Sequence, residues 1–525
     1  MKSVSEKKET TETPDVVDEK TFLRVVTDPM RPLLGLARLG FTRPGKGGVF
    51  TRPFLARIGL EATRIEETLD ACGARNNRSW FPFRELVAAA KLFAEAGYML
   101  LHLRFTTPVY QLLPIEEDFP QATDAAIDTL ADVLHAVSRE LLRTARKIGL
   151  PEVDLSDRDD FREIVPSGGL PVDRKRRHID EPGKTVCYLA TAFLNLSEES
   201  RLLEIYKNVQ EEEYPQCIPD SINEEGLREL ENKFHNLQSL YDTNISDSDI
   251  EDQDRSLRIM RGHVSIIFHL LETATAFSHY YERHMHLPTD EMRWRFRYPV
   301  TPETLLRVLM TYSIAFAYRF IKAAQDLCHN ILRVYAEEGR IDVPVPNYRG
   351  FHVRPSTLVA KIIAHYGSRV EMRLEDEVYD ASRPLELFRA NEQINAKKRK
   401  FIAEELAKLP VVQQSGKARG AELKEGLKEI WVSLLSHHGV VVYDQDFTYN
   451  DLEPFEDETL IEYGKRWVAH CLALGKIDVD INIMVSFVGD KRVLDDIRLL
   501  VEYGYGEDKF GNNVVLPAKL SYLKR

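Results

Sequence analysis

The stretch Ile341-Asp342-Val343-Pro344-Val345-Pro346 marks a change in the character of this 525-residue chain. Apolar residues alternate here with other residues, which is the period of a β-strand, and the two prolines suit a strand at the edge of a sheet. Before this stretch, apolar residues recur every three or four positions, as they do on the buried side of helices. We therefore expect the fold to change near residue 340 from helices alone to strands and helices together.

The residues that follow predict a small α+β domain. A helix is predicted over residues 356–366, and strands are predicted over residues 369–374 and 377–380. A second helix is predicted to begin at Arg383 or Pro384. This β-α-β-β-α order is incomplete, because a final strand and helix are missing.

A suitable strand and helix are found further along the chain. Residues 479–487 alternate strictly between apolar and other side chains, which predicts a strand, and residues 490–501 predict a helix. The residues between the two parts have mainly helical periodicity. We therefore predict one small α+β domain, at residues 340–396 and 477–525, split by a helical insertion at residues 397–476.

The first part of the chain, residues 21–339, is predicted to form a helical domain. Amphipathic segments occur at residues 86–103 and 125–148, and longer helices are predicted over residues 252–285 and 302–338. Long helices joined by short loops favour a helical bundle. The predicted fold class is therefore α+β multidomain, with a mostly α-helical N-terminal bundle before the small domain.

The composition is that of a soluble acidic protein. The chain has 70 Lys and Arg residues and 83 Asp and Glu residues, and its net charge of -13 disfavours broad binding to nucleic acid. No run of about 18 apolar residues is recognised, so no membrane insertion is expected. Residues 1–20 are polar, lack the apolar core of a signal peptide and are predicted to be a disordered tail. Five widely spaced cysteines, without zinc-type spacing, favour a reducing cytoplasm.

The motif Gly350-Phe351-His352-Val353-Arg354-Pro355 places a titratable ring beside a permanent charge at the start of a predicted helix. A neutral imidazole can accept a phosphoryl group, and an unperturbed pKa of about 6.5 allows the neutral form near neutral pH. Backbone amides at a helix N-terminus stabilise such a group, and the Arg354 guanidinium matches phosphate oxygens. An ordinary loop histidine is the alternative interpretation of these six residues alone.

Several segments, in order along the chain, resemble the phosphocarrier protein HPr family of the bacterial phosphoenolpyruvate-dependent phosphotransferase system. Residues 343–347 resemble that family's first strand, and residues 350–355 resemble its active-centre motif, usually Gly-aliphatic-His-Ala-Arg-Pro. Further segments match its third strand, its last strand and helix, and its usual ending: residues 378–382, 480–489, 494–500 and 504–507. The resemblance implies an HPr-like open-faced β-sandwich.

The resemblance also implies roles for individual residues. In the family, the matching histidine takes a phosphoryl group from Enzyme I and passes it on, so His352 is the implied phosphoryl acceptor. Arg354 is implied to stabilise the phosphate. Val353 departs from the usual small residue, and its branched side chain is expected to crowd a partner. Ser382 matches the family's regulatory serine, although an N-cap role is the simpler interpretation.

Two other groups of residues are interpreted as structural. The basic run at residues 174–178 is interpreted as part of a solvated loop. A long predicted helix carries a set of histidines together with Glu272 and Glu282, which follow two of them at i+3 spacing. These histidines are His263, His269, His279, His284 and His286. No facing set of carboxylates is recognisable, so no metal and no cofactor is predicted.

The sequence thus predicts a cytoplasmic, bacterial HPr-like phosphocarrier or phosphorylation-dependent regulator. Its expected partners are an Enzyme I-like phosphoryl donor and an unknown acceptor or target protein. Two alternatives stay open: an HPr-like scaffold that is not phosphorylated, and a helical bundle that binds a ligand or metal as an enzyme under HPr-like regulation. Long helices can also pair between chains, so a homo-oligomer is left open.

Overall fold

A computed structural model of the chain describes residues 16–42, 50–153, 161–163, 170, 171, 173, 175–285, 299–414, 421–437, 440–443 and 452–524. The chain divides into two compact units. The first unit comprises Met1–Asp180 and Leu196–Leu327, and the second comprises Glu181–Asn195 and Cys328–Arg525. Helices predominate and the larger sheet is antiparallel, so the predicted α+β class with mostly helical content is confirmed.

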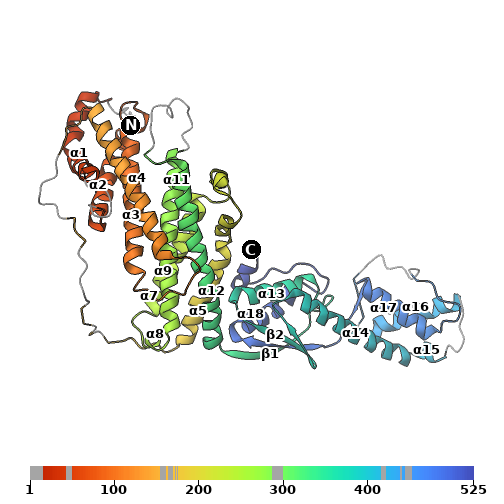
Figure 1. Cartoon of the computed structure of the whole chain (residues 1–525). Coiled ribbons are helices and arrows are strands. Elements are labelled where there is room, and N and C mark those ends of the chain that lie inside the picture. The colour runs from red at the N-terminus through yellow and green to blue at the C-terminus, as the bar shows by residue number, and fades with distance from the viewer. Residues whose placement is uncertain are drawn as a thin grey trace, which may run out of the picture. The chain divides into compact units, whose positions relative to one another are not determined.

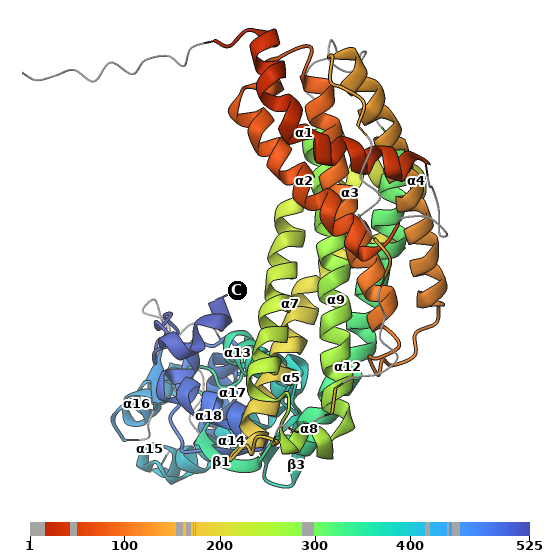
Figure 2. The same ribbon diagram turned by 90° about the vertical axis from the view of Figure 1, so that its left-hand side faces the viewer.

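The first unit is a bundle of long helices (Figure 1). Its described α-helices are α1 (Glu19–Thr42), α2 (Arg52–Ala71), α3 (Phe81–Thr106), α4 (Phe119–Lys147), α6 (Tyr214–Cys217), α7 (Glu224–Asn244), α8 (Asp249–Gln253), α9 (Arg255–Tyr280) and α11 (Pro302–Arg307). Helix α3 packs against α2, α4 and α9, and α7 packs along α9 (Figure 2). The helices α5 (Pro182–Glu199) and α12 (Ala315–Tyr335) have residues in both units.

Helix α3 lies in the core of the first unit because it is apolar around most of its circumference. Phe83 and Phe93 are fully buried, and so is the charged side chain of Arg84. The guanidinium of Arg84 is paired with carboxylates of α2, at 2.7 Å from Asp70 Oδ2 and 2.9 Å from Glu66 Oε1. These ion pairs offset the cost of burying the charge.

Among the described residues, two segments have the length and composition of membrane-spanning helices: α3 and Pro302–Tyr335. In each, 72% of the apolar window is buried inside the structure. Core helices of soluble proteins share these properties, so the two segments are weak support for a membrane span. The expectation of no membrane insertion stays a prediction.

Three boundaries in the first part of the chain differ from the sequence-based expectation. Residues 1–15 lie outside the described residues, and α1 begins at Glu19, so the predicted disordered tail does not reach residue 20. The helix expected over residues 252–285 is broken at Asp254, whose carboxylate accepts a hydrogen bond from Ser256 N at 2.8 Å and caps α9. The helix expected over 302–338 ends at Tyr335. The apolar periodicity of the sequence continues through these three boundaries. It therefore does not predict the residue at which each helix begins or ends.

The second unit contains a four-stranded antiparallel sheet of order β1-β6-β2-β3. Its strands are β1 (Glu338–Pro344), β2 (Val370–Leu374), β3 (Glu377–Asp380) and β6 (Met484–Asp490). Strand β6 is the last in the sequence but lies between β1 and β2, so Phe487 is opposite both Ile341 and Met372. Residues of β2 alternate between buried and exposed, which shows that one face of the sheet is covered.

Three helices share one hydrophobic core with the covered face of this sheet. They are α13 (Val353–Tyr366), α14 (Pro384–Lys408) and α18 (Lys491–Glu502). In this core, α14 contributes residues from its first half, including Leu387 and Ile394. The elements therefore follow the order β-α-β-β-α, then β-α after the intervening residues 397–476.

The intervening residues form a second core of their own. Its elements are the later part of α14, α15 (Pro410–Gln414), α16 (Ala421–His437), β4 (Val440–Val442), α17 (Leu460–Ala473) and β5 (Ile477–Val479). The rings of Trp431 and Trp467 pack edge to face at 5.1 Å within it. The prediction of a single strand over residues 479–487 is wrong. Two separate strands lie in this region: β5 pairs with β4, whereas β6 joins the larger sheet. Alternation is the same in both strands, so it does not reveal that they belong to different sheets.

A buried ion pair connects the two cores of the second unit. Lys398 Nζ lies 2.7 Å from Asp478 Oδ1, and both side chains are almost fully buried. The other oxygen of Asp478 accepts a hydrogen bond from Arg349 N at 3.0 Å. Because its partners satisfy both oxygens, the carboxylate can stay buried, and it fixes the backbone just before the GFHVRP motif.

Substitution of Phe487 tests the role of β6 in the sheet. We expect Phe487→Ala to lower the free energy of unfolding of the second unit by about 3–5 kcal/mol, because it opens a cavity among fully buried side chains. Hydrogen exchange of the β2 and β6 amides measures this change. Phe510→Ala, at an exposed phenylalanine, is the control and should change it by about 0.5 kcal/mol or less. Equal effects of the two substitutions would contradict the assignment of β6 to the core.

Candidate functional site

His352 lies at the start of α13, after the loop that follows β1. It is the N-cap residue of this helix, with extended backbone angles (φ -78°, ψ -167°), and Pro355 lies in the first turn as the motif predicts. The first amides of a helix have no acceptor within the helix, and their dipoles favour a negative group nearby. His352 is therefore placed where a phosphoryl group would be stabilised.

The loop before His352 has an unusual backbone that an asparagine of α14 holds in place. Arg349 and Gly350 both adopt left-handed conformations, with φ of 55° and 63°. Asn391 Oδ1 accepts a hydrogen bond from Phe351 N at 2.9 Å, and Asn391 Nδ2 donates one to Arg349 O at 3.0 Å. A Cβ atom at Gly350 would lie 2.1 Å from Asn391 Oδ1, so only glycine fits. Asn391 is a positioning residue that no sequence signal indicated.

Phe351 anchors the motif in the hydrophobic core. Its side chain is fully buried, and its ring packs edge to face against Tyr505 at 5.6 Å. The carbonyl of Phe351 accepts a hydrogen bond from Ser356 Oγ at 2.9 Å. Because Phe351 points inward, the next side chain, His352, reaches the surface and keeps 25% of its area exposed.

The imidazole of His352 is held by Glu507, a residue 155 positions later in the chain. His352 Nε2 lies 2.7 Å from Glu507 Oε2, and the Glu507 side chain is 8% exposed. A carboxylate accepts hydrogen bonds, so this geometry assigns the ring proton to Nε2. In the described part of the chain, no residue hydrogen-bonds to His352 Nδ1. The arrangement leaves an unprotonated nitrogen at Nδ1 that can act as a nucleophile.

Arg354 lies beside the same carboxylate. Its Nε is 3.9 Å from Glu507 Oε1, and its Nη1 donates a hydrogen bond to Asn513 Oδ1. The structure thus brings together His352 and Arg354, the two site residues expected from the motif, and adds Glu507 and Asn513. The only sequence signal for Glu507 is the resemblance of residues 504–507 to the HPr ending, which carried no role for its side chain.

Tyrosines connect the site with the intervening residues 397–476. The ring of Tyr348 packs edge to face against His352 at 5.4 Å and against Tyr443 at 4.7 Å. Tyr443 Oη donates a hydrogen bond to Asn347 O at 3.3 Å, and burial raises the pKa of this tyrosine. The residue after β4 therefore contacts the loop that carries the candidate nucleophile.

Two expectations about the neighbours of the site need adjustment. Val353 points away from the protein and is 68% exposed, so its side chain lies on the surface beside His352. The N-cap interpretation of Ser382 is wrong, because Arg383 is the N-cap residue of α14. Ser382 Oγ instead donates a hydrogen bond to Asp380 Oδ1 at 2.6 Å. A phosphate on Ser382 would lie beside that carboxylate, which opposes it, and the regulatory role of Ser382 stays a prediction.

The histidine of α9 with the deepest burial is His263. Its Nε2 accepts a hydrogen bond from Leu113 N at 3.0 Å, and its Nδ1 donates one to Phe320 O at 3.1 Å. Both ring nitrogens are therefore used by the backbone. Burial lowers the pKa of His263 to about 4, so the ring is neutral near neutral pH. This histidine has a structural role in the bundle.

The other histidines of this helical segment pair with carboxylates. His269 Nδ1 lies 3.2 Å from Glu272 Oε2, which is the expected i+3 pair, whereas His279 contacts Glu224 of α7 at 3.0 Å instead of Glu282. His284 lies 2.9 Å from Glu85, and His286 lies outside the described residues. Over the described ranges, no group of three or more His, Cys, Asp or Glu residues could hold a metal ion.

The basic run at residues 174–178 contacts an acidic loop, although its side chains are exposed. Arg176 pairs with Asp247 at 3.1 Å and with Asp252 at 2.8 Å. His178 Nδ1 lies 2.5 Å from Asp249 Oδ2, and this carboxylate raises the pKa of His178. Residue 174 lies outside the described residues. The interpretation as an independent solvated loop is therefore incomplete, because the positive charge is partly neutralised within the chain.

Comparisons with known proteins found no match: no protein-family model, no curated protein and no solved structure matches this chain. The resemblance to the HPr family therefore stays a prediction. A functional assignment depends on the geometry around His352.

The burial of His263 predicts a pH dependence of stability. Its pKa is about 4 in the folded chain and about 6.5 in the unfolded chain, so the unfolded chain binds more protons between these values. The free energy of unfolding should therefore fall by up to about 3 kcal/mol as the pH decreases from 6.5 to 4. Hydrogen exchange of the α9 amides at several pH values measures how steeply the free energy of unfolding changes with pH. The slope should be shallower in His263→Gln, and an unchanged slope would show that His263 is not the titrating group.

Proposed function

We propose that this chain is an HPr-like phosphocarrier or phosphorylation-dependent regulator that accepts a phosphoryl group on His352 and signals through its helical domain. The observation that carries the proposal is the hydrogen bond between His352 Nε2 and Glu507, which leaves Nδ1 as the unprotonated ring nitrogen. The proposal includes a bacterial, cytoplasmic setting, an Enzyme I-like donor and an unknown acceptor or target protein.

The chemical step follows from this tautomer. The Nδ1 lone pair of His352 attacks the phosphorus atom of the phosphorylated donor, and a bond between Nδ1 and phosphorus forms. The bond between phosphorus and the leaving atom of the donor breaks, and its electron pair stays with the donor. Because Nε2 keeps its proton, the ring becomes positively charged as the new bond forms. The Glu507 carboxylate at 2.7 Å stabilises that charge.

The negative charge of the phosphoryl group also has partners near His352. The amide dipoles at the start of α13 favour an anion. Arg354 supplies a permanent positive charge, and 37% of its side chain is exposed, so it can contact an incoming phosphate. Different groups thus offset the two charges. Glu507 stabilises the positive charge of the ring, whereas Arg354 and the start of α13 stabilise the negative charge of the phosphoryl group.

The surface around the His352 ring would let a donor protein reach it. His352 is partly exposed, and the neighbouring Val353 presents an apolar side chain to solvent. An exposed apolar residue beside a reactive group suits contact with a partner protein. Val353 would then contribute contact area to the donor complex, in contrast to the crowding that the sequence suggested.

Phosphorylation by a bacterial Enzyme I tests the proposal. The full chain is incubated with Enzyme I and phosphoenolpyruvate labelled in its phosphoryl group. We expect acid-labile label on the wild-type chain, none on His352→Ala, and full labelling of His178→Ala, which removes an exposed histidine outside the site. The measurement is radioactivity retained before and after acid treatment, with the labelled peptide mapped by mass spectrometry.

A known phosphocarrier substrate of the same Enzyme I in a parallel tube controls for donor activity. If that substrate is labelled and the wild-type chain is not, the proposal is wrong for this donor class. Equal labelling of wild type and His352→Ala would also contradict it, because the phosphoryl group would then be on another residue.

A further inference from the structure

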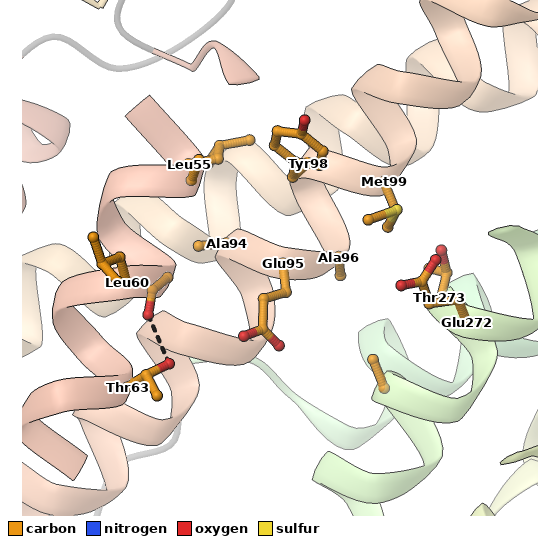
Figure 3. A pocket seen from close by; sticks show the side chains of 13 residues that line it. Leu55, Leu60, Thr63, Ala94, Glu95, Ala96, Tyr98, Met99, Glu272 and Thr273 are labelled. Atoms are coloured by element: carbon orange, nitrogen blue, oxygen red, sulfur yellow. Dashed lines mark hydrogen bonds between the residues drawn. The ribbon is translucent and has the colours of Figure 1, made fainter. Parts of the chain in front are cut away.

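A pocket of about 450 Å³ lies within the first unit, between α2, α3 and α9 (Figure 3). This volume falls in the range of sites for small molecules. Helix α2 contributes residues between Leu55 and Thr63, α3 contributes residues between Ala94 and Met99, and α9 contributes Glu272, Thr273 and Ala276. Three rigid helices therefore form its walls.

Most of the pocket surface is apolar. Leu55, Ala94 and Ala96 are buried and form part of its wall. Leu60 also lines the pocket and has 55% of its area exposed, and the Met99 side chain lies near Glu272 and Thr273 of α9 (Figure 3). Small side chains on α3 keep the space open. An aliphatic or aromatic group of a ligand would be removed from water here.

A solvent-exposed carboxylate without a partner, that of Glu95, lines this pocket. Figure 3 shows the Glu95 side chain extending from α3 between the α2 wall and the α9 wall. Gly59 of α2 leaves room for it, since a Cβ there would lie 3.7 Å from Glu95 Cγ. Glu95 makes no hydrogen bond and no ion pair with any residue that the structure describes. The Glu95 side chain is exposed to solvent, so a cation that enters the pocket can pair with its carboxylate without displacing another partner.

The electrostatic surroundings of Glu95 point to the sign of the ligand. Desolvation by the apolar walls raises the pKa of Glu95, Lys91 lowers it, and the carboxylates of Glu66 and Glu272 raise it. Lys91 is itself paired with Glu66, at 2.5 Å, and Glu272 contacts His269. The pocket thus holds two carboxylates, of which Glu95 is without a direct cation.

We propose that this pocket binds a small organic cation, with an ammonium group against Glu95 and Glu272 and an aliphatic or aromatic body along the apolar wall. A cation would pair with Glu95 and reduce its repulsion with Glu272, whereas an anion would add repulsion. The site lies entirely in the first unit, so the inference does not depend on phosphorylation of His352.

Calorimetric titration of the full chain with three matched probes tests the charge requirement. The probes are 4-phenylbutylamine, 4-phenylbutanol and 4-phenylbutyrate, which share a body and differ in charge. We expect saturable binding of the amine, binding of the alcohol that is about tenfold weaker, and no binding of the acid. Binding of the amine that is no tighter than that of the alcohol, or no saturable binding of the amine at millimolar concentration, would overturn the proposal.

Variants then locate the binding site. Glu95→Gln keeps the side-chain size and should weaken amine binding about tenfold while leaving alcohol binding unchanged. Ala276→Phe should fill the pocket and abolish binding of both probes. Glu67→Gln removes an exposed carboxylate of α2 outside the pocket and should change neither. Circular dichroism should confirm that Glu95→Gln is folded. If the folded variant binds the amine with unchanged affinity, the proposed role of Glu95 is wrong.

Discussion

The pairing of β6 with both β1 and β2 is the interaction on which the candidate site depends. This strand comes more than a hundred residues after β2 in the sequence, and it carries α18 and the following turn to the position beside α13. Glu507 follows this helix and lies 2.7 Å from His352. The antiparallel sheet thus makes one site from two segments that residues 397–476 separate. Any change that removes β6 from the sheet would also remove the carboxylate from the imidazole.

The sequence was sufficient for the fold class and for much of the site. Two-residue alternation indicated β1 and β2, residues 377–380 were a short candidate strand where β3 lies, and the GFHVRP motif placed His352 at a helix N-terminus, because these signals are local. Contacts between residues far apart in the sequence left no such local pattern. Asn391 is an ordinary polar residue within a helix, and its role depends on the left-handed loop that it holds. The division of residues 479–487 between two sheets depends on the choice of neighbouring strand, which alternation does not encode.

The residues between α14 and β6 are more than a spacer. They form a core together with the later part of α14, and they contact the loop of the site through Tyr443 and through Asp478. Asp478 holds the backbone of Arg349, and Asn391 holds the carbonyl of the same residue. The conformation before His352 is therefore fixed from two directions. A rigid loop at this point presents the imidazole in one orientation, which favours reaction at one ring nitrogen.

The tautomer of His352 is the most direct test of this account, because the proposed nucleophile is defined by which nitrogen carries the proton. Long-range ¹H–¹⁵N correlation spectra of the full chain, labelled with ¹⁵N-histidine and assigned with His352→Gln, measure it. The account predicts a proton on Nε2 and none on Nδ1 near neutral pH, with loss of this preference in Glu507→Gln. A proton on Nδ1 in the wild-type chain would contradict it.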